Sequence, residues 1–426
     1  MTHHPVPPAL AHSLFPEEIL EVLRRLKGAG HAAYLVGGLV RDVLLGKAGA
    51  DFDIATSARA EQVQKLFRKV IPTGIQHGTV TVLTRRDKVE VTTFRGEGAY
   101  ADGRRPDSVV FLDDVVDDLA RRDFTINAMA FDPIDQDFVD PFGGADDLAR
   151  RVVRCVGTPR DRFTEDGLRP LRAVRFASVL DFEIDPATRE AIPATLSTFA
   201  RIARERVREE LSKTLLGPHP GRGIRLLHET ALLAEILPEL LTTSPGQLAR
   251  TLARLDAAPR EVELRYAALL WDLAPEVAEA ALESLRLPRA VIDTTVALLR
   301  MQSFALEPLV GDAELRRRLS RAGRALVPKL LSLGAAEAQA GADREAQATV
   351  HDVQAATERV LATNPPLTVG ELALDGRAVM GILGSAPGRV VGEALRFLLE
   401  QVLEDPSRNE PSTLEKLLGD WRAKSS

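Results

Sequence analysis

The chain has 426 residues, of which 45% are hydrophobic, 27% charged and 5% aromatic, and its formal net charge is −6. This length exceeds one typical hydrophobic core and predicts two or more domains. The single cysteine, Cys155, excludes a disulfide framework and a cysteine-based zinc site and fits a reducing compartment. The acidic balance argues against a general nucleic-acid coat protein, but arginines gather in 201–225 and 314–324. These two segments are compatible with a phosphate-binding stripe or with solvated helix faces.

No segment of the chain predicts export or membrane insertion. The first residues, MTHHPVPPAL, have neither the basic start nor the apolar run of a signal peptide, and no apolar stretch reaches membrane-spanning length. We therefore expect a soluble cytoplasmic protein.

The first 140 residues combine helical and strand patterns. Within 15–29, EEILEVLRRLKGAG predicts an amphipathic helix, and AAYLV predicts a strand that leads into a glycine pair and the helix LVRDVLL. DFDIA then predicts a strand, EQVQKLF a helix, and GTVTVL and KVEVTTF two strands around the polar turn TRRD. Because short turns join some of these strands, we expect an antiparallel or mixed sheet and not a doubly wound parallel one.

Strand signals fade from about residue 165 onward. Segments rich in Leu, Ala, Arg and Glu at helical spacing dominate, with breaks at LGPHPGRG, TTSPG, LPRA and NPPLT. The expected fold class is α+β, in which a head with a mixed or antiparallel sheet and helices precedes an all-α neck, body and tail.

The strand DFDIA carries two carboxylates, Asp51 and Asp53, one residue apart. Residues i and i+2 of a strand share a face, so these two side chains would lie close together. Like charges at that separation repel and raise each other's pKa unless a cation lies between them. The pair therefore predicts a metal site, with a solvated strand end as the alternative.

LVGGLVRD, residues 35–42, places a glycine pair between a strand and a helix just before these acids. Gly37 and Gly38 would allow the backbone to approach a ligand closely, and the start of the helix offers free N–H groups to an anion. Arg41 can add a bidentate contact to a phosphate. Taken alone, the pattern is more often a simple turn, but a phosphate cradle beside paired carboxylates is what phosphoryl transfer requires.

Four segments together resemble one family. LVGGLVRDVLLG with DFDIAT, VTTFRGEGAYADGRRPDSVVF, RRDFTINAMAFDP and EDGLRPLRAVRFA occur here in the order typical of bacterial-type (class II) tRNA nucleotidyltransferases and poly(A) polymerases, most like the CCA-adding enzymes. The resemblance implies template-independent addition of C, C and A, from CTP and ATP, to tRNA 3′ ends with release of pyrophosphate. It also implies two Mg²⁺ ions on Asp51 and Asp53 and the tRNA acceptor arm as partner.

The resemblance extends to further site residues. It assigns Arg122 and Asp123 of RRDFTINA to the incoming nucleotide, with Asp123 suited to accept from a ribose hydroxyl; a salt-bridged helix start is the alternative. It places Arg172 and Arg175 near the nucleotide phosphates. Glu90 of KVEVTTF, on a strand expected beside DFDIA, could supply a third carboxylate for the metal, or it could be a solvated strand residue.

TEDGLRPLRAVRF carries Asp166 and Arg169 three residues apart. Cytosine and adenine both present an amino donor beside a ring-nitrogen acceptor, whereas uracil and guanine present the reverse. A carboxylate beside a guanidinium would therefore select C and A, and in the family this EDxxR motif acts as a protein template. On a regular helix the two would share a face, but Pro170 predicts a helix start as late as Gly167, or a kink. A charged helix face without function is the alternative.

Two other segments refine the expectation. GEGAYADGRRP resembles a flexible loop that the family links to addition of the terminal A, which disfavours a CC-only enzyme; a surface loop without function is the alternative. LRYAALLWDLAPE, residues 264–276, resembles the start of a metal-phosphohydrolase domain. Trp271 stands there in place of the metal-binding histidine, so we expect a structural helical segment and no second active site.

The expected domains are a catalytic head (1–148), a helical neck (149–215), a helical body (216–310) and a tRNA-binding tail (311–426). An A-adding enzyme and a poly(A) polymerase share the chemistry and stay open as alternatives. A non-catalytic RNA-binding protein on a transferase scaffold is a further alternative, although the intact motifs argue against it. The oligomeric state is not predicted. The candidate tail contacts to RNA phosphates are Arg316, Arg317, Arg318, Arg321 and Arg324.

Overall fold

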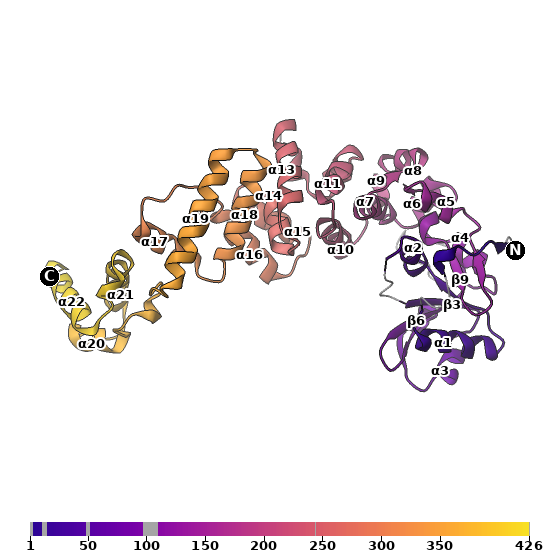
Figure 1. The fold of residues 1–426 in the computed structure, drawn as a ribbon, viewed down its shortest axis with the longest axis horizontal. Coiled ribbons are helices and arrows are strands. Elements are labelled where there is room, and N and C mark those ends of the chain that lie inside the picture. The colour runs from indigo at the N-terminus through magenta and orange to yellow at the C-terminus, as the bar shows by residue number, and fades with distance from the viewer. Residues whose placement is uncertain (1–2, 11–14, 48–51, 97–109, 243, 426) are drawn as a thin grey trace. The chain divides into compact units, whose positions relative to one another are not determined.

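The structure is a computed structural model that describes residues 3–10, 15–47, 52–96, 110–242 and 244–425 (Figure 1). The expected metal ligand Asp51 and most of the GEGAYADGRRP segment lie outside these residues. The chain forms two compact units, 1–241 and 242–426. The four-part division expected from the sequence stays a proposal.

The first unit is built on a mixed sheet. Among the described residues it has eight strands in the order β1-β10-β9-β2-β3-β6-β5-β4. β3 and β6 pair in parallel and the other neighbours are antiparallel, which confirms the expected mixed sheet. The strands are β1 (His3–His4), β2 (Ala33–Val36), β3 (Phe52–Thr56), β4 (Val70–Gly74), β5 (Thr79–Leu83), β6 (Lys88–Thr93), β9 (Ala130–Asp132) and β10 (Asp137–Val139).

The two faces of the central strands differ in what covers them. Helices α1 (Glu17–Gly28) and α3 (Ala60–Leu66) pack on one face, where Val89 and Val91 of β6 are 0% and 1% exposed (Figure 1). The alternate residues of the same strand, including Glu90, are exposed on the other face. A polar surface is thereby left beside the apolar core of the head.

Shorter helices and strand pairs complete the first unit. The helices are α2 (Gly38–Leu44), α4 (Val115–Ala120), the 3-10 turn η4 (Thr125–Asn127), α5 (Gly144–Ala149), α6 (Pro159–Glu165), α7 (Arg169–Leu180), α8 (Pro186–Ala191), α9 (Leu196–Phe199), α10 (Arg204–Leu215), α11 (Pro220–Glu229) and α12 (Leu232–Ile236). The pairs are β7 (Arg95–Gly96) with β8 (Val110–Phe111) and β11 (Val152–Val153) with β12 (Glu183–Ile184). β12 interrupts the region expected to be all helical, because a strand of two residues is too short to show a period in the sequence.

The EDxxR segment is a turn between two helices. α6 ends at Glu165, and α7 begins at Arg169 with Pro170 in its first turn, where a missing N–H costs nothing. The expectation that Asp166 and Arg169 share one helical face is therefore wrong, and the helix starts later than Gly167. At Gly167 the turn lies against α9, since a Cβ there would come within 2.8 Å of the Thr198 carbonyl oxygen.

The described residues of the second unit form helices and no strands. They are α13 (Pro245–Ala257), α14 (Val262–Leu270), α15 (Pro275–Ser284), α16 (Arg289–Arg300), α17 (Asp312–Ala322), α18 (Val327–Ala340), α19 (Arg344–Ala362), α20 (Gly376–Leu383), α21 (Arg389–Glu404) and α22 (Pro411–Ser425). Within the described ranges of the whole chain, no helix combines the length and the apolar character needed to cross a membrane.

Candidate active site

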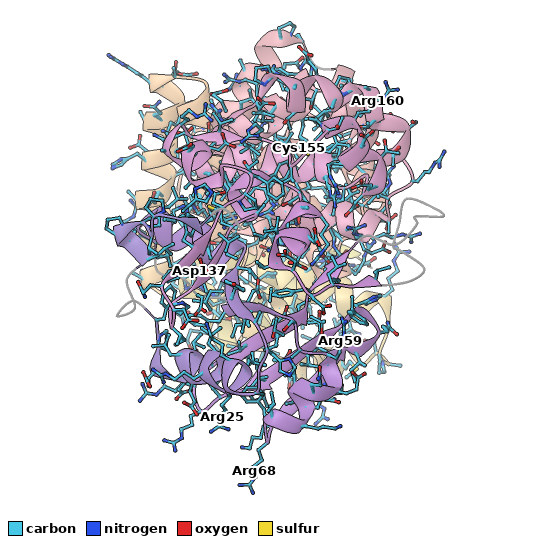
Figure 2. The ribbon with its side chains drawn as sticks, turned by 90° about the vertical axis from the view of Figure 1, so that its right-hand side faces the viewer. Arg25, Arg59, Arg68, Asp137, Cys155 and Arg160 are labelled. Carbon is cyan, nitrogen blue, oxygen red and sulfur yellow. The ribbon has the colours of Figure 1, made fainter. Side chains whose placement is uncertain are left out.

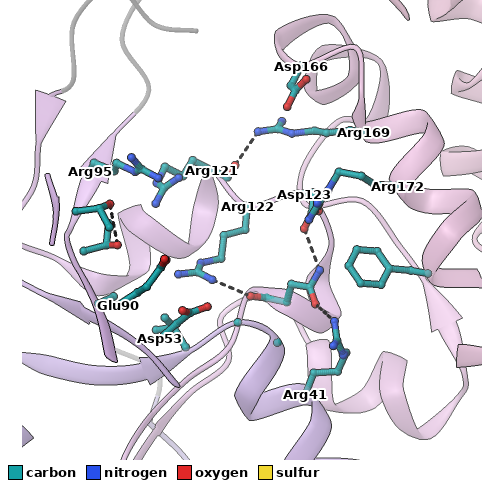
Figure 3. A pocket seen from close by; sticks show the side chains of 18 of the residues that line it. Arg41, Asp53, Glu90, Arg95, Arg121, Arg122, Asp123, Asp166, Arg169 and Arg172 are labelled. Carbon is teal, nitrogen blue, oxygen red and sulfur yellow. Dashed lines mark hydrogen bonds and ion pairs between the residues drawn. The ribbon is translucent and has the colours of Figure 1, made fainter. Parts of the chain in front are cut away.

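A polar cleft of about 700 Å³ opens above the uncovered face of the sheet (Figure 3). Side chains reach it from the β2–α2 turn, from β3, β5 and β6, from the segment after α4, and from α7 and α10. Every described head or neck residue that the sequence singled out lines it. These residues are Gly37, Gly38, Arg41, Asp53, Glu90, Arg122, Asp123, Asp166, Arg169, Arg172 and Arg175.

Asp53 and Glu90 lie side by side on the floor of the cleft. They are direct partners in the parallel pairing of β3 and β6, so their side chains project from the same face of the sheet (Figure 3). Carboxylate oxygens are the ligands that Mg²⁺ prefers. The described residues hold no group of three His, Cys, Asp or Glu that could bind a metal, and Asp51 lies outside them. The donor type of this pair fits a magnesium site that Asp51 would complete.

The glycine pair lies where the backbone comes close to an arginine. Gly37 has a φ of +71°, and a Cβ at this position would lie 2.7 Å from Nη1 of Arg122. The backbone conformation therefore requires glycine, and a side chain here would displace the guanidinium group of Arg122. Arg41 follows one turn later on α2, and its Nη1 donates to Oδ1 of Asn127 at 2.7 Å.

Asp118 fixes two cleft arginines from behind. Its carboxylate is 1% exposed and accepts from Arg121 at 2.7 Å and from Arg122 at 3.1 Å. Burial alone would raise the pKa of Asp118, but the positive charges of Arg121 and Arg122 outweigh this and lower it. The sequence analysis missed Asp118 and Arg121. Their signal was the i+3 and i+4 spacing from the last aspartate of DDVVDD to the arginine pair RR.

Asp123 plays the same part for Arg172. It is 9% exposed, and its carboxylate accepts from Arg172 Nε at 2.7 Å, from Asn127 Nδ2 at 3.1 Å and from the N–H of Phe124 at 2.8 Å. Burial would raise the pKa of Asp123, yet Arg172 and the hydrogen bond from Asn127 lower it to about 2. Asn127, which the sequence analysis missed, thus connects Arg41 to Asp123.

A third buried acid lies behind Arg172 and Arg175 of α7. Glu210 on α10 is 4% exposed and pairs with Arg175 at 2.5 Å, with Lys213 at 3.4 Å and with Arg172 at 3.7 Å. The ring of Phe176 lies 4.0 Å from the Arg175 guanidinium carbon and 5.4 Å from that of Arg172. These contacts hold the side chains of α7 in fixed positions at the cleft wall.

Asp166 and Arg169 present an acceptor and a donor from the α6–α7 turn (Figure 3). Asp166 accepts from the N–H of Leu168 at 3.0 Å and from Arg206 at 2.9 Å. Arg169 is 8% exposed and donates to Glu165 at 2.8 Å and to the carbonyl of Arg121 at 2.9 Å. Each group therefore has its own support, and the turn brings the two to the same cleft without a shared helical face.

The arginines expected to contact RNA lie on or just after α17 in the second unit and are largely used in packing. Arg316 donates at 2.6 Å to the carbonyls of Leu403 and Glu404, and Arg324 at 2.7 Å to that of Pro365. Arg317 pairs with Glu400 and, at 2.6 Å, with Glu404.

The other two α17 arginines differ strongly in exposure. Arg318 is 7% exposed and donates to the carbonyls of Glu307 and Pro308 at 2.9 and 3.0 Å. This placement argues against a contact between Arg318 and RNA. The side chain of Arg321 is 69% exposed, and its ion pair with Glu314 spans 3.6 Å.

The phosphohydrolase-like segment lies inside the helical packing of the second unit. Trp271 is 8% exposed and its ring lies 5.1 Å from the guanidinium carbon of Arg254. Arg254 is fully buried and pairs with Glu337 and, at 3.2 Å, with Asp272. Arg254 and Trp271 thus pack together in the interior of this segment, which agrees with the structural role expected for it.

Comparison with known proteins matches three parts of the chain to family models. Residues 33–154 match the poly A polymerase head domain, 181–242 a probable RNA and SrmB-binding site of polymerase A, and 258–418 a putative domain 2 of tRNA nucleotidyltransferase. The three models follow one another along nearly the whole chain.

Curated relatives and solved structures agree with these matches. The chain is 39% identical over 401 residues to a CCA-adding enzyme of Geobacillus stearothermophilus, covering 92% of this chain and 94% of the relative. The crystal structure of the Bacillus stearothermophilus CCA-adding enzyme in complex with CTP aligns with a TM-score of 0.79 at 33% identity over 98% of this chain and 99% of that one. A Thermotoga maritima CCA-adding enzyme complexed with tRNA aligns at 0.67 and 21% identity over 99% of this chain and all of that one, which shows a common fold. The chain belongs to the family of the CCA-adding tRNA nucleotidyltransferases.

Proposed function

We propose that this protein adds C, C and A to the 3′ ends of tRNA from CTP and ATP and releases pyrophosphate. Its family membership over more than nine tenths of the chain supports this activity. The structural observation that carries the proposal is the meeting of three groups in one cleft: paired carboxylates, a wall of anchored arginines, and an acceptor–donor pair for a base. Each corresponds to one part of a nucleotidyl transfer.

We assign the metal to Asp51, Asp53 and Glu90. Two bound Mg²⁺ ions would lower the pKa of the tRNA 3′-hydroxyl and stabilise negative charge on the α-phosphate. The chain supplies the oxygen ligands on two adjacent strands, and the parallel register of β3 and β6 keeps Asp53 and Glu90 level with each other. The carboxylates thus define the end of the cleft at which the 3′-hydroxyl would be placed.

The triphosphate would lie along the arginines. Arg41 and Arg122 flank the glycine turn, and Arg172 and Arg175 continue the row on α7. Buried acceptors hold these guanidinium groups before substrate arrives, so little reorganisation is needed when phosphate charge enters. Because Asp123 is occupied by Arg172 and Asn127, we assign it first to orienting Arg172, with a ribose contact as its second expected role.

The base would be chosen by Asp166 and Arg169. Asp166 would accept from the amino group of cytosine or adenine, and Arg169 would donate to the neighbouring ring nitrogen. Uracil and guanine would place a carbonyl against the carboxylate and an N–H against the guanidinium. This arrangement supports the use of CTP and ATP as the two substrates.

The remaining expectations stay part of the proposal. We assign the catalytic head to 1–148, the neck to 149–215, the body to 216–310 and the tail to 311–426, with the tail holding tRNA. Of the α17 arginines, Arg321 is the best remaining candidate for an RNA contact because its side chain is the most exposed. We also infer a cytoplasmic location.

The activity is tested with three tRNAs that end before the C residues, after one C and after CC, each incubated with Mg²⁺ and one labelled nucleotide. We expect C on the first two, a single A on the third, and neither U nor G on any of them. Addition of A alone would indicate an A-adding enzyme, and long A tracts a poly(A) polymerase. Binding of tRNA without incorporation would contradict enzymatic activity.

The base-selecting pair has its own test in the same assay. Arg169→Ala should lower kcat/KM for CTP and ATP by about 100-fold, because the acceptor on the base loses its donor. Arg160→Ala, an exposed arginine on the same α6–α7 segment, is the matched control and should leave both values unchanged. Retention of full activity by Arg169→Ala would overturn the assignment.

A further inference from the structure

The sheet face that carries the catalytic carboxylates continues beyond the cleft. Lys88 precedes Glu90 by two residues on β6, and both are exposed whereas Val89 between them is fully buried. Lys88 and Glu90 therefore project from the same face, about 7 Å apart along the strand. Lys88 thus lies one step along the strand from Glu90, outside the residues that line the cleft.

Neighbouring strands add cations at this end of the sheet. Leu83 of β5 is the direct partner of Lys88, and its N–H donates at 3.0 Å to the carbonyl of Lys69, which precedes β4. Arg85 and Arg86 form the turn that joins β5 to β6. All of these basic side chains are exposed. We call Lys69, Arg85, Arg86 and Lys88 the edge cluster.

The edge cluster differs from the other basic groups of the head in its partners. Within the described residues, none of the edge-cluster side chains forms an ion pair or a hydrogen bond. The arginines of the cleft, in contrast, form ion pairs with buried acids. Two acids lie beside the cluster: Asp87 stands between Arg86 and Lys88 in the chain, and Glu18 uses its carboxylate to accept from the N–H groups of Arg85 and Arg86 at 3.0 and 3.1 Å. Four exposed cations on a chain with a net charge of −6 make a local positive surface.

The surface next to the cluster supports contact with a nucleic acid strand. Ile71 of β4 is the partner of Thr81, which in turn pairs with Glu90, and Ile71 is 42% exposed, so an apolar side chain lies two residues from Lys69 and two strands from Glu90. Arg68, beside Lys69 in the chain, projects away from the ribbon at the edge of the head (Figure 2). Single-strand binding usually combines cations that follow the phosphates with aromatic side chains that stack on bases. Here the edge cluster supplies the cations, and Ile71 offers an apolar but not an aromatic contact.

We propose that the edge cluster binds the backbone phosphates of the RNA whose 3′ end is being extended. The inference rests on the proposed function and adds to it the path of the RNA on the head. Asp53 and Glu90 would repel an approaching phosphodiester chain, and the cations of the same sheet face offset this repulsion. The cluster therefore acts on RNA binding and not on the choice or the binding of the nucleotide.

The proposal is tested with the double variant Lys69→Glu/Lys88→Glu in the full-length protein. We expect its Kd for a tRNA that ends in CC to rise about tenfold at moderate salt, and the slope of log Kd against log salt to fall by about 1.4, as two lost phosphate contacts on a single strand predict. The KM for ATP should change less than twofold. Lys69→Gln/Lys88→Gln should show the same changes at smaller size.

The matched control is Lys65→Glu/Arg160→Glu, which reverses two exposed charges elsewhere in the same unit, outside the segment 181–242 that matches an RNA-binding model. It should leave Kd and salt slope near the wild-type values. Equal losses in both double variants, or wild-type binding by Lys69→Glu/Lys88→Glu, would overturn the proposal. Kd and its salt slope are measured without catalysis, so they test the edge cluster even if the wild-type protein adds no nucleotide. Failure of the wild-type protein to add nucleotides would count against the proposed function and not against the edge cluster.

Discussion

The arginines of the cleft and those of α17 look alike in the sequence but have different surroundings. In the cleft, buried acids lie behind the guanidinium groups: Asp118 behind Arg121 and Arg122, and Glu210 behind Arg175. On α17, Arg316 and Arg317 donate to the end of α21, and their charge is used within the fold. An arginine-rich segment thus forms a binding surface only where its acceptors lie behind the guanidinium groups. The guanidinium groups then still face a cavity.

Basic side chains outnumber carboxylates among the residues that line the cleft. Asp118 and Asp123 each pair with arginines that line the cleft. Because both acids are buried, these charge-assisted hydrogen bonds are strong. In the tail, the acids that pair with Arg317 of α17 lie on α21, so these ion pairs join two helices. The four predictions below test this difference, beginning with the largest effect.

Asp53→Asn should abolish nucleotide addition, with kcat lowered by more than about 1,000-fold, because it removes the negative charge of a proposed metal ligand on the floor of the cleft. The same loss is expected for Asp51→Asn. Filter binding should show tRNA affinity within about threefold of wild type. Turnover close to wild type in either variant would refute the metal assignment and remove the basis for treating the cleft as the reactive region.

Arg254→Ala tests a buried cation of the second unit whose role we take to be purely structural. Loss of this fully buried side chain leaves Glu337 and Asp272 without their main partner, and we expect a destabilisation of about 3–5 kcal/mol. Thermal and urea unfolding would measure it. Arg250→Ala is the control, since Arg250 pairs with the same Glu337 from a half-exposed position and should cost less than about 1 kcal/mol. Similar losses in both variants would contradict the importance of burial.

Asp123→Asn should make the stability of the first unit less dependent on pH in the acidic range. The folded-state pKa of Asp123 is lowered from 3.8 to about 2, chiefly because Arg172 outweighs the effect of burial. A lowered pKa contributes stability above the unfolded value, here about 2 kcal/mol, and this contribution is lost as the pH falls from about 4 to about 2. The variant should lose that amount at pH 7 and little at pH 2, as urea titrations at both values would measure. An equal difference at both pH values would exclude this linkage.

Much of the head was predictable because its patterns are local. The alternation in KVEVTTF placed Glu90 on a strand beside DFDIA, and the two strands are neighbours in the sheet, although the parallel direction of their pairing was not predicted. The acids behind the arginines were not predictable in the same way. Glu210 meets Arg175 across 35 residues, and no period in the sequence connects them. The turn at Asp166 was misread because helix spacing was applied to a segment that a proline shifts out of the helix.

The tail was the least predictable part for a related reason. The sequence shows the spacing of arginines on α17 but not the carbonyl groups of α21 and of 304–308 that accept from them. Backbone acceptors have no sequence signature, because every residue has one. Exposure of a charged residue on a long helix can therefore be predicted from the pattern of its own helix only when no other element covers that face.

Arg317→Ala gives the smallest expected effect and completes the comparison. Its ion pairs with Glu400 and Glu404 are half-exposed, so we expect a loss of less than about 1 kcal/mol in stability and no measurable change in tRNA affinity. Arg321→Ala on the same helix removes a more exposed cation, and it should weaken tRNA binding about threefold while leaving stability unchanged. Calorimetry and binding titrations at two salt concentrations would separate the two variants. The reverse result, in which Arg317→Ala weakens tRNA binding and Arg321→Ala does not, would show that ion pairs within the tail open when RNA binds. The distinction between packed and available arginines would then hold only for the free protein.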